Sequence, residues 1–141
     1  MNIALTGGSG FIGRPLARRL LADGHSLHLL GRNWPPESLA DAEAIVNLAG
    51  EPVAQRWTAA AKQRIRASRV EGTRRLVAAL PRCPAVLVSA SAVGIYGSRG
   101  AEVLTESSPP GEGFLAEVCG EWERAAAAAE HRSIGRLAGE L

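Results

Sequence analysis

A glycine-rich turn near the N-terminus constrains the fold of this chain more than any other feature. Gly7, Gly10 and Gly13 are spaced three residues apart and directly follow the apolar run 2–6. Such a short run is typical of a strand that is buried on both faces of a parallel sheet. Leucines at helical spacing come next, so the segment predicts a strand, a tight turn and an amphipathic helix over 11–22.

The rest of the chain continues this alternation of strands and helices. Apolar runs predict three more strands and helical spacing predicts two more helices, in the order 26–30 (strand), 43–48 (strand), 58–80 (helix), 85–89 (strand) and 114–130 (helix). The stretch 91–113 is rich in Gly, Ser and Pro, which is typical of a functional loop. This order predicts the α/β class, with a Rossmann-like, doubly wound parallel sheet.

The glycine turn has the composition of a phosphate-binding loop. Glycines let the main chain approach a diphosphate, and the first N–H groups of the following helix attract its negative charge. A glycine triplet alone is a weak signal, but here it stands between a predicted strand and a predicted helix. The loop therefore predicts a dinucleotide site formed by Thr6, Gly7, Gly10, Phe11, Ile12 and Gly13. The alternative is a glycine-rich turn that binds nothing.

The end of the second predicted strand indicates which dinucleotide is bound. NAD-selective sites commonly place an acidic residue there to accept a hydrogen bond from the ribose 2′-hydroxyl, whereas this chain has Arg32 between Gly31 and Asn33. A guanidinium cannot accept that bond, but it pairs well with a 2′-phosphate. We therefore expect NADP(H) to be preferred over NAD(H). Arg14 is a second candidate partner, and the alternative for Arg32 is a surface arginine without a ligand.

Several motifs occur in the order found in one family. They are Thr6 to Gly13, Asn47-Leu48-Ala49-Gly50-Glu51-Pro52, residues 68–76, Ser89-Ala90-Ser91-Ala92-Val93-Gly94-Ile95-Tyr96-Gly97, residues 105–110 and residues 114–123. Over positions 1 to about 130 the chain resembles the extended, atypical short-chain dehydrogenase/reductases of the NAD(P)-dependent epimerase/dehydratase family, in the nucleoside-diphosphate-sugar epimerase branch.

The resemblance implies roles for two further groups of residues. Leu48, Ala49 and Gly50 would lie along the ribose side of the cofactor. Ser91 would form a hydrogen bond with a carbonyl or hydroxyl of a small-molecule or sugar-nucleotide substrate. The alternative for Ser91 is a hydroxyl that caps the end of a strand.

The chain departs from the family at the residues that transfer protons. Typical members carry a Tyr-x-x-x-Lys pair on the last helix, and the matching positions here hold Phe114 and Val118, which cannot exchange a proton. The one tyrosine, Tyr96, is a candidate substitute acid or base, although the favoured alternative is a loop aromatic packed over the cofactor cleft. Two functions stay open: an NADP(H)-binding fragment of an epimerase/dehydratase-like oxidoreductase, or a non-catalytic dinucleotide-binding module or degenerate remnant.

The predicted fold is also incomplete. Only the eight residues 33–40 separate Arg32 from Asp41, so the third strand of the family is expected to be missing. The tail 131–141 lacks the pattern of the buried strand expected there, and we expect the smaller substrate-binding part of the family to be missing. We therefore expect an NAD(P)-binding domain over 1–130, a tail without family resemblance, and self-association through uncovered apolar surface.

Composition makes other classes of function improbable. The net charge is only +2, although basic residues are concentrated between positions 56 and 82. Trp57 is the only aromatic residue in that stretch, so we expect a solvated helix face rather than a nucleic-acid surface. No apolar run approaches the ~20 residues of a membrane span, which favours a cytoplasmic protein. Cys83 and Cys119 lack the spacing of metal ligands and are expected to be buried thiols.

Overall fold

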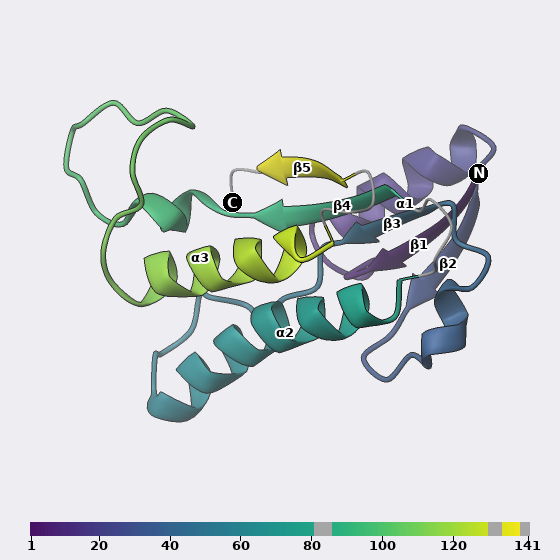
Figure 1. Ribbon diagram of the computed structural model, residues 1–141, viewed down its shortest axis with the longest axis horizontal. Coiled ribbons are helices and arrows are strands. Elements are labelled where there is room, and N and C mark those ends of the chain that lie inside the picture. Colours follow the sequence, from purple (N-terminus) through teal and green to yellow (C-terminus); the bar gives the residue numbers. More distant parts are fainter. Residues whose placement is uncertain (81–85, 130–133, 139–141) are drawn as a thin grey trace.

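Five parallel strands form one sheet in the order β2-β1-β3-β4-β5 (Figure 1). The computed structural model describes residues 1–80 and 86–129 and the backbone of 134–138. The strands are β1 (Asn2–Thr6), β2 (Ser26–Leu30), β3 (Ala44–Asn47), β4 (Val86–Ser91) and β5 (Ile134–Ala138). The predicted Rossmann-like parallel sheet is therefore confirmed.

Three helices cover the two faces of this sheet. They are α1 (Gly13–Ala22), α2 (Ala59–Ala78) and α3 (Phe114–Ala127), and two short 3-10 turns, η1 (Pro36–Leu39) and η2 (Val93–Tyr96), lie in the connections. Strand β2 pairs with one side of β1, whereas β3, β4 and β5 follow one another on the other side. Right-handed crossovers consequently place α1 on one face and the adjacent helices α2 and α3 on the other (Figure 1).

The main core lies between the sheet and the α2 and α3 layer. Strand side chains alternate between the faces, and every second residue, such as Ala4, Ile45 and Leu87, points toward this layer. Leu76 of α2 and Leu80, just after that helix, pack against them. Trp34 and Leu39 from the connection before β3, Leu30 and Ala129 complete the cluster. The side chain of Thr58 caps α2 by accepting a hydrogen bond from the Ala61 amide at 3.1 Å, which fixes where the helix begins.

The connection between β2 and β3 contains no strand in the described structure. Residues 31–43 form only turns and η1, so the predicted absence of a third strand at this place is confirmed. As a result β2 is an edge strand. The Ser26 amide donates to the Met1 carbonyl of the neighbouring segment, so the alternating main-chain groups of Leu27 and Leu29 point to the open edge. Leu29 is 55% exposed, which leaves apolar surface beside that edge.

The prediction that the tail contains no strand is wrong. Residues Ile134–Ala138 form β5, which pairs in parallel with β4 from Leu87 to Ser91. The segment is short and includes a glycine and an arginine, so its own pattern does not predict a strand. Main-chain pairing with the edge of β4 stabilises the strand instead. Smaller differences concern boundaries: the first helix begins at Gly13, β4 extends to Ser91, and the last helix ends at Ala127. Cys83 lies outside the described residues.

Candidate functional site

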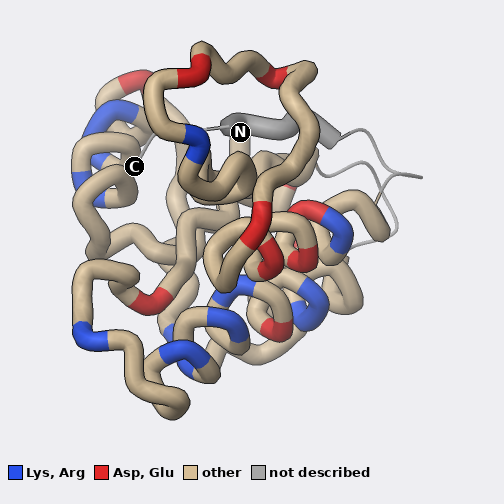
Figure 2. The backbone as a smooth tube through the Cα atoms, turned by 90° about the vertical axis from the view of Figure 1, so that its left-hand side faces the viewer, with Lys and Arg blue, Asp and Glu red and all other residues tan. Residues whose placement is uncertain are grey.

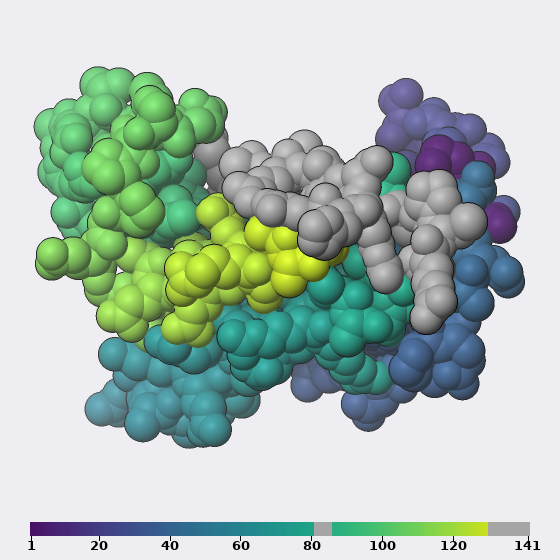
Figure 3. Space-filling view, in the orientation of Figure 1, coloured from purple at the N-terminus to yellow at the C-terminus, as the bar shows by residue number. Residues whose placement is uncertain are grey.

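The carboxyl ends of the strands bring the predicted site residues to one edge of the sheet. The glycine loop follows β1, Arg32 follows β2, residues 48–50 follow β3, and Ser91 ends β4. The strand order reverses between β1 and β3, with helices on opposite faces at that point. Ligands of open α/β sheets bind in the crevice that such a reversal creates. The loop 97–112 projects beyond this edge, as Figures 1 and 3 show.

The glycines of the first loop are required by close contacts. Gly7 has a φ of +71°, and a Cβ there would lie 2.6 Å from the carbonyl group of Leu48. A Cβ on Gly13 would overlap the carbonyl oxygen of Gly7. The Gly10 amide donates to that same oxygen at 2.9 Å, which closes the turn. A larger residue at Gly7 would push the loop away from the turn after β3, and one at Gly13 would push the start of α1 away from the loop.

Main-chain N–H groups at the start of α1 are free. The Arg14 amide donates to the Gly10 carbonyl, but the amides of Phe11, Ile12 and Gly13 have no partner within the described ranges. The side chain of Phe11 is 94% exposed and that of Ile12 is 38% exposed, so neither is packed into the loop. The first turn of α1 contains no acidic residue. Free amides at the positive end of a ten-residue helix fit a diphosphate.

Thr6 supports this edge from inside. Its side chain is 5% exposed, and its hydroxyl donates to Asn47 Oδ1 at 2.8 Å. The hydroxyl oxygen of Thr6 in turn accepts hydrogen bonds from the amides of Leu48 and Ala49, each at 3.2 Å. Thr6 therefore holds the turn after β3 against the glycine loop.

A buried polar network centred on Asn47 ties the sheet to the helices. Asn47 Nδ2 donates to Thr73 Oγ1 of α2 at 2.9 Å and to Ser89 Oγ of β4 at 3.3 Å. The indole of Trp122 on α3 donates to the same Thr73 oxygen at 3.0 Å. Among the described residues no buried side-chain nitrogen or oxygen lacks a partner. Sequence analysis missed this network, although a polar residue that ends an apolar strand was a usable signal.

Arg32 lies at the far side of the edge with its guanidinium available. Its carbonyl accepts a hydrogen bond from Arg75 at 3.3 Å, while its side chain is exposed and forms no hydrogen bond with any residue the structure describes. Hydrogen bonding from Gln55 and the nearby Arg64 lower the pKa of the Glu51 carboxyl, and the charge of Arg32 adds to that effect. Arg32 is therefore an exposed cation at the same edge of the sheet as the turn after β3.

The end of β4 holds Ser91 in a defined hydrogen bond. Its hydroxyl donates to Glu123 Oε1 of α3 at 2.6 Å, and the residue is only 9% exposed. A serine has one proton to donate, so Ser91 can act toward a ligand only as an acceptor while Glu123 is ionised. Tyr96 lies in η2 and is half-buried, and its hydroxyl bonds to no other residue in the described part of the chain.

Apolar side chains occupy the two positions at which the family carries its proton-transfer pair. Phe114 begins α3 and meets Trp57 edge to face, with the ring centroids 5.5 Å apart. The one lysine of the chain, Lys62, places its Nζ 5.2 Å from the Phe114 ring centre. Val118 is 1% exposed and lies in the core. The lysine is therefore paired with an aromatic face rather than with a tyrosine hydroxyl.

A half-buried arginine that sequence analysis did not single out lies below the turn after β3. Arg69 Nη1 donates to the Glu51 carbonyl at 2.9 Å, and its guanidinium lies 5.4 Å from the centre of the Trp122 ring. Burial lowers the pKa of Arg69, yet a guanidinium remains charged at neutral pH. Cys119 is buried nearby, and burial raises the pKa of its thiol. The sequence offered only a run of basic residues here, without a sign of which one turns inward.

Most of the other basic residues in 56–82 are paired. Arg66 forms ion pairs with Glu117 and Glu121 of α3 at 3.3 and 2.5 Å, and Arg64 pairs with Glu51 at 3.4 Å. Arg75 donates to the Trp34 carbonyl and stacks over its ring. In Figure 2 basic and acidic residues are interspersed rather than gathered into one patch. These pairs join α2 to its neighbours and reduce the positive charge of the helix face.

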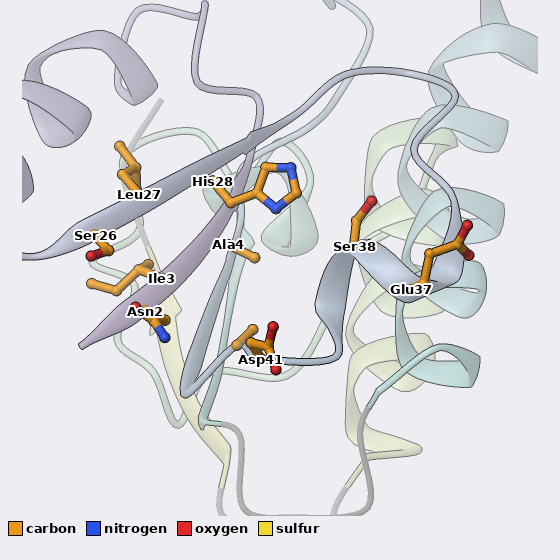
Figure 4. Close-up of a pocket in the computed structure, with 10 residues that line it drawn as sticks. Asn2, Ile3, Ala4, Ser26, Leu27, His28, Glu37, Ser38 and Asp41 are labelled. Carbon is orange, nitrogen blue, oxygen red and sulfur yellow. The ribbon is translucent and has the colours of Figure 1, made fainter.

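A cavity of about 360 Å³ lies at the other end of the sheet. It is lined by the starts of β1 and β2, including Asn2 and Ser26, and by Glu37 and Ser38 of η1 (Figure 4). This position is toward the amino ends of the strands, away from the glycine loop.

The described residues contain no group of three or more His, Cys, Asp or Glu side chains that could hold a metal ion. None of their helices is both long and apolar enough to cross a membrane.

Comparison with known proteins finds relatives over most of the chain. The family model described as the NAD dependent epimerase/dehydratase family matches residues 3–136. A chloroplastic homologue of the epimerase family protein SDR39U1 from Arabidopsis thaliana is 39% identical over 150 residues, covering 87% of this chain and 43% of the plant protein. That alignment is longer than the part of this chain that it covers, so the plant protein has residues without a counterpart here.

Solved structures show the same similarity. A nucleoside-diphosphate sugar epimerase from Corynebacterium glutamicum superposes with a TM-score of 0.81 at 37% identity, over 98% of this chain and 33% of that one. The human epimerase family protein SDR39U1, solved with NADPH, gives a TM-score of 0.77 at 28% identity, over 98% of this chain and 52% of the human one. The chain spans less than half the length of the curated relatives that it matches, such as 43% of the plant protein.

Proposed function

Because the chain belongs to the NAD dependent epimerase/dehydratase family, we propose that it is the dinucleotide-binding part of an epimerase/dehydratase-like oxidoreductase. Residues 1–130 form the binding unit, whose sheet is extended by β5, and the loop from Thr6 to Gly13 receives the diphosphate. The observation that carries the proposal is the row of free amides at Phe11, Ile12 and Gly13, which lie at the start of α1 after a turn closed by Gly7 and Gly10.

The preferred cofactor is NADP(H). Arg32 follows the strand next to the glycine loop, and its exposed guanidinium has no hydrogen-bonding partner among the residues described. It is therefore free to pair with a 2′-phosphate, and no carboxylate stands beside it in the sequence to accept a bond from a 2′-hydroxyl. The NADPH held by the human relative supports the same preference.

A nicotinamide cofactor, when bound, would supply hydride transfer, and the chain would supply binding and orientation. Gly50 and the turn around it offer a close main-chain surface to the cofactor. Ser91 contributes a hydrogen-bond acceptor because its own proton is directed to Glu123. We therefore expect the group held at Ser91 to be a hydroxyl of a small molecule or sugar nucleotide, rather than a carbonyl.

A second candidate function is binding without turnover. It is favoured by one observation: Phe114 and Val118 stand where the family transfers a proton, and the single lysine lies against Phe114. In this case the chain holds NADP(H) as a sensor or scaffold. Oxidation of a hydroxyl of UDP-glucose or another sugar nucleotide by NADP+, followed as the rise of NADPH absorbance, would support the oxidoreductase, and so would conversion of the sugar nucleotide itself, followed by chromatography, because an epimerase returns the hydride and consumes no cofactor. Binding with neither change across such a panel would support the binding module.

Titration with NADPH and NADH tests the cofactor assignment. Arg32→Gln is expected to weaken NADPH about tenfold, because a charge-assisted contact is lost, and to leave NADH almost unchanged. Arg124→Gln, which removes an equal charge from the exposed side of α3, is the matched control and should change neither. An equal loss for both cofactors would refute the 2′-phosphate role. If neither cofactor changes the fluorescence or the melting temperature at millimolar concentration, the dinucleotide assignment is wrong.

A further inference from the structure

Arg69 has donor groups that the protein itself does not use. Its Nη1 donates to the carbonyls of Glu51 and Ile65, at 2.9 and 3.4 Å, but Nε and Nη2 have no partner in the described part of the chain. No buried side-chain nitrogen there is left without a partner, so these two nitrogens reach the surface. A half-buried cation thus presents free N–H groups to solvent, which makes it available to a ligand.

The position of these groups follows from Gly50. A Cβ on Gly50 would lie 2.9 Å from Arg69 Cζ and 3.0 Å from Nη2. The guanidinium therefore occupies the space beside the bare main chain at the carboxyl end of β3. Any side chain at position 50 would displace it. Gly50 is itself exposed, so the guanidinium lies immediately below the ligand-facing edge of the sheet.

The order of the strands determines which part of the cofactor lies beside Gly50 and Arg69. In the proposed binding mode the adenosine ribose lies at the end of β2 beside Arg32, and the diphosphate lies on the glycine loop after β1. The strand on the other side of β1 is β3. The second half of the dinucleotide, which is a ribose and a nicotinamide, must continue over the end of β3, where Gly50 and Arg69 lie.

The chemistry of Arg69 matches this half. A guanidinium only donates, and its planar fork suits two neighbouring oxygens such as a vicinal diol. The Glu51 carbonyl and the face of Trp122 hold the group in place, so little side-chain freedom is left to lose on binding. We propose that Arg69 is a binding residue for the nicotinamide ribose, donating from Nε and Nη2 to its hydroxyl oxygens. This inference rests on the proposed function.

Two probes separate this role from a general effect on binding. NADPH contains the second ribose, whereas adenosine 2′,5′-bisphosphate ends before it. Arg69→Met is expected to weaken NADPH at least tenfold and to leave the bisphosphate within about twofold, measured by calorimetry on the full chain. Arg64→Met is the control, because Arg64 lies on the same helix but is exposed and pairs with the side chain of Glu51. It should change neither affinity.

Two further variants keep the test decisive if Arg69→Met unfolds the chain. Arg69→Lys retains the charge but loses the fork, and Gly50→Ala displaces the guanidinium without removing it. Each should weaken NADPH selectively, by about three- to tenfold, with the bisphosphate affinity retained. Equal losses for both probes, or an unchanged NADPH affinity in a folded variant, would overturn the role of Arg69 alone. Failure of the unaltered chain to bind either probe would overturn the proposed function, and this inference with it.

Discussion

A negative charge at position 11 should weaken dinucleotide binding without harming the fold. Phe11 is 94% exposed and precedes α1, so replacing it removes no core contact. Phe11→Asp places a carboxylate beside the free amides, and Phe11→Asn places a neutral side chain of the same shape there. Comparing these two variants isolates charge from the loss of the ring. A carboxylate at the start of a helix also interacts favourably with the helix dipole, by about 0.3–1 kcal/mol.

The size of the effect follows from Coulomb's law. Two unit charges about 6 Å apart, at an effective dielectric constant of about 60, interact by about 1 kcal/mol. A diphosphate carries two negative charges, which gives about 2 kcal/mol, and salt at physiological strength reduces this to about 1–1.5 kcal/mol. The Kd of Phe11→Asp for NADPH should therefore be about 5- to 15-fold higher than that of Phe11→Asn.

Fluorescence titration with NADPH at two salt concentrations is the assay. The difference between the two variants should shrink as salt rises, because the charges lie at the surface. Val103→Asp, at a site that is 87% exposed in the projecting loop, controls for net charge and should bind as the unaltered chain does. Equal Kd values for Phe11→Asp and Phe11→Asn, with both variants folded, would refute the placement of the diphosphate at these amides.

Three other predictions concern stability and association. Asn47→Ala should lower the free energy of unfolding, measured in urea, by about 3 kcal/mol, because it leaves buried polar groups of Thr73, Ser89 and Thr6 without a hydrogen-bond partner. The control Asn33→Ala, at an exposed site, should lower it by less than about 0.5 kcal/mol. The open edge of β2 should cause self-association at tens of micromolar, as measured by light scattering, and Leu29→Lys should reduce it. A monodisperse monomer of the unaltered chain would contradict this prediction. Because burial raises the pKa of Cys119 above its ordinary value of 9.0, its contribution to stability is complete below about pH 9 and is lost at higher pH as the unfolded thiol ionises. Cys119→Ala should therefore lose less stability than the unaltered chain between pH 8 and pH 10.

The candidate site was predictable where its residues are contiguous and unpredictable where they are not. The glycine loop, the strand before it and the helix after it lie within the first 22 residues, and their pattern predicted both the turn and its place at the carboxyl edge. The short connection after Arg32 likewise predicted a missing strand from its length alone. Arg69 could not be distinguished from the other arginines of α2, because only its packing against Gly50 and Trp122 separates it from them.

The amino-acid sequence by itself determined the local features: β1 and β2 to the residue, the α/β order of elements, and the glycine-rich turn between β1 and α1. These depend on the spacing of apolar residues and on backbone conformation, which neighbouring residues control. Tertiary structure alone decided that the tail forms β5, that Ser91 donates to Glu123, and that Asn47 joins three strands to α2, where Thr73 connects them to Trp122 of α3. The partners in those side-chain contacts are 26 to 49 residues apart, so their hydrogen bonds exist only after the sheet and its helices have packed together.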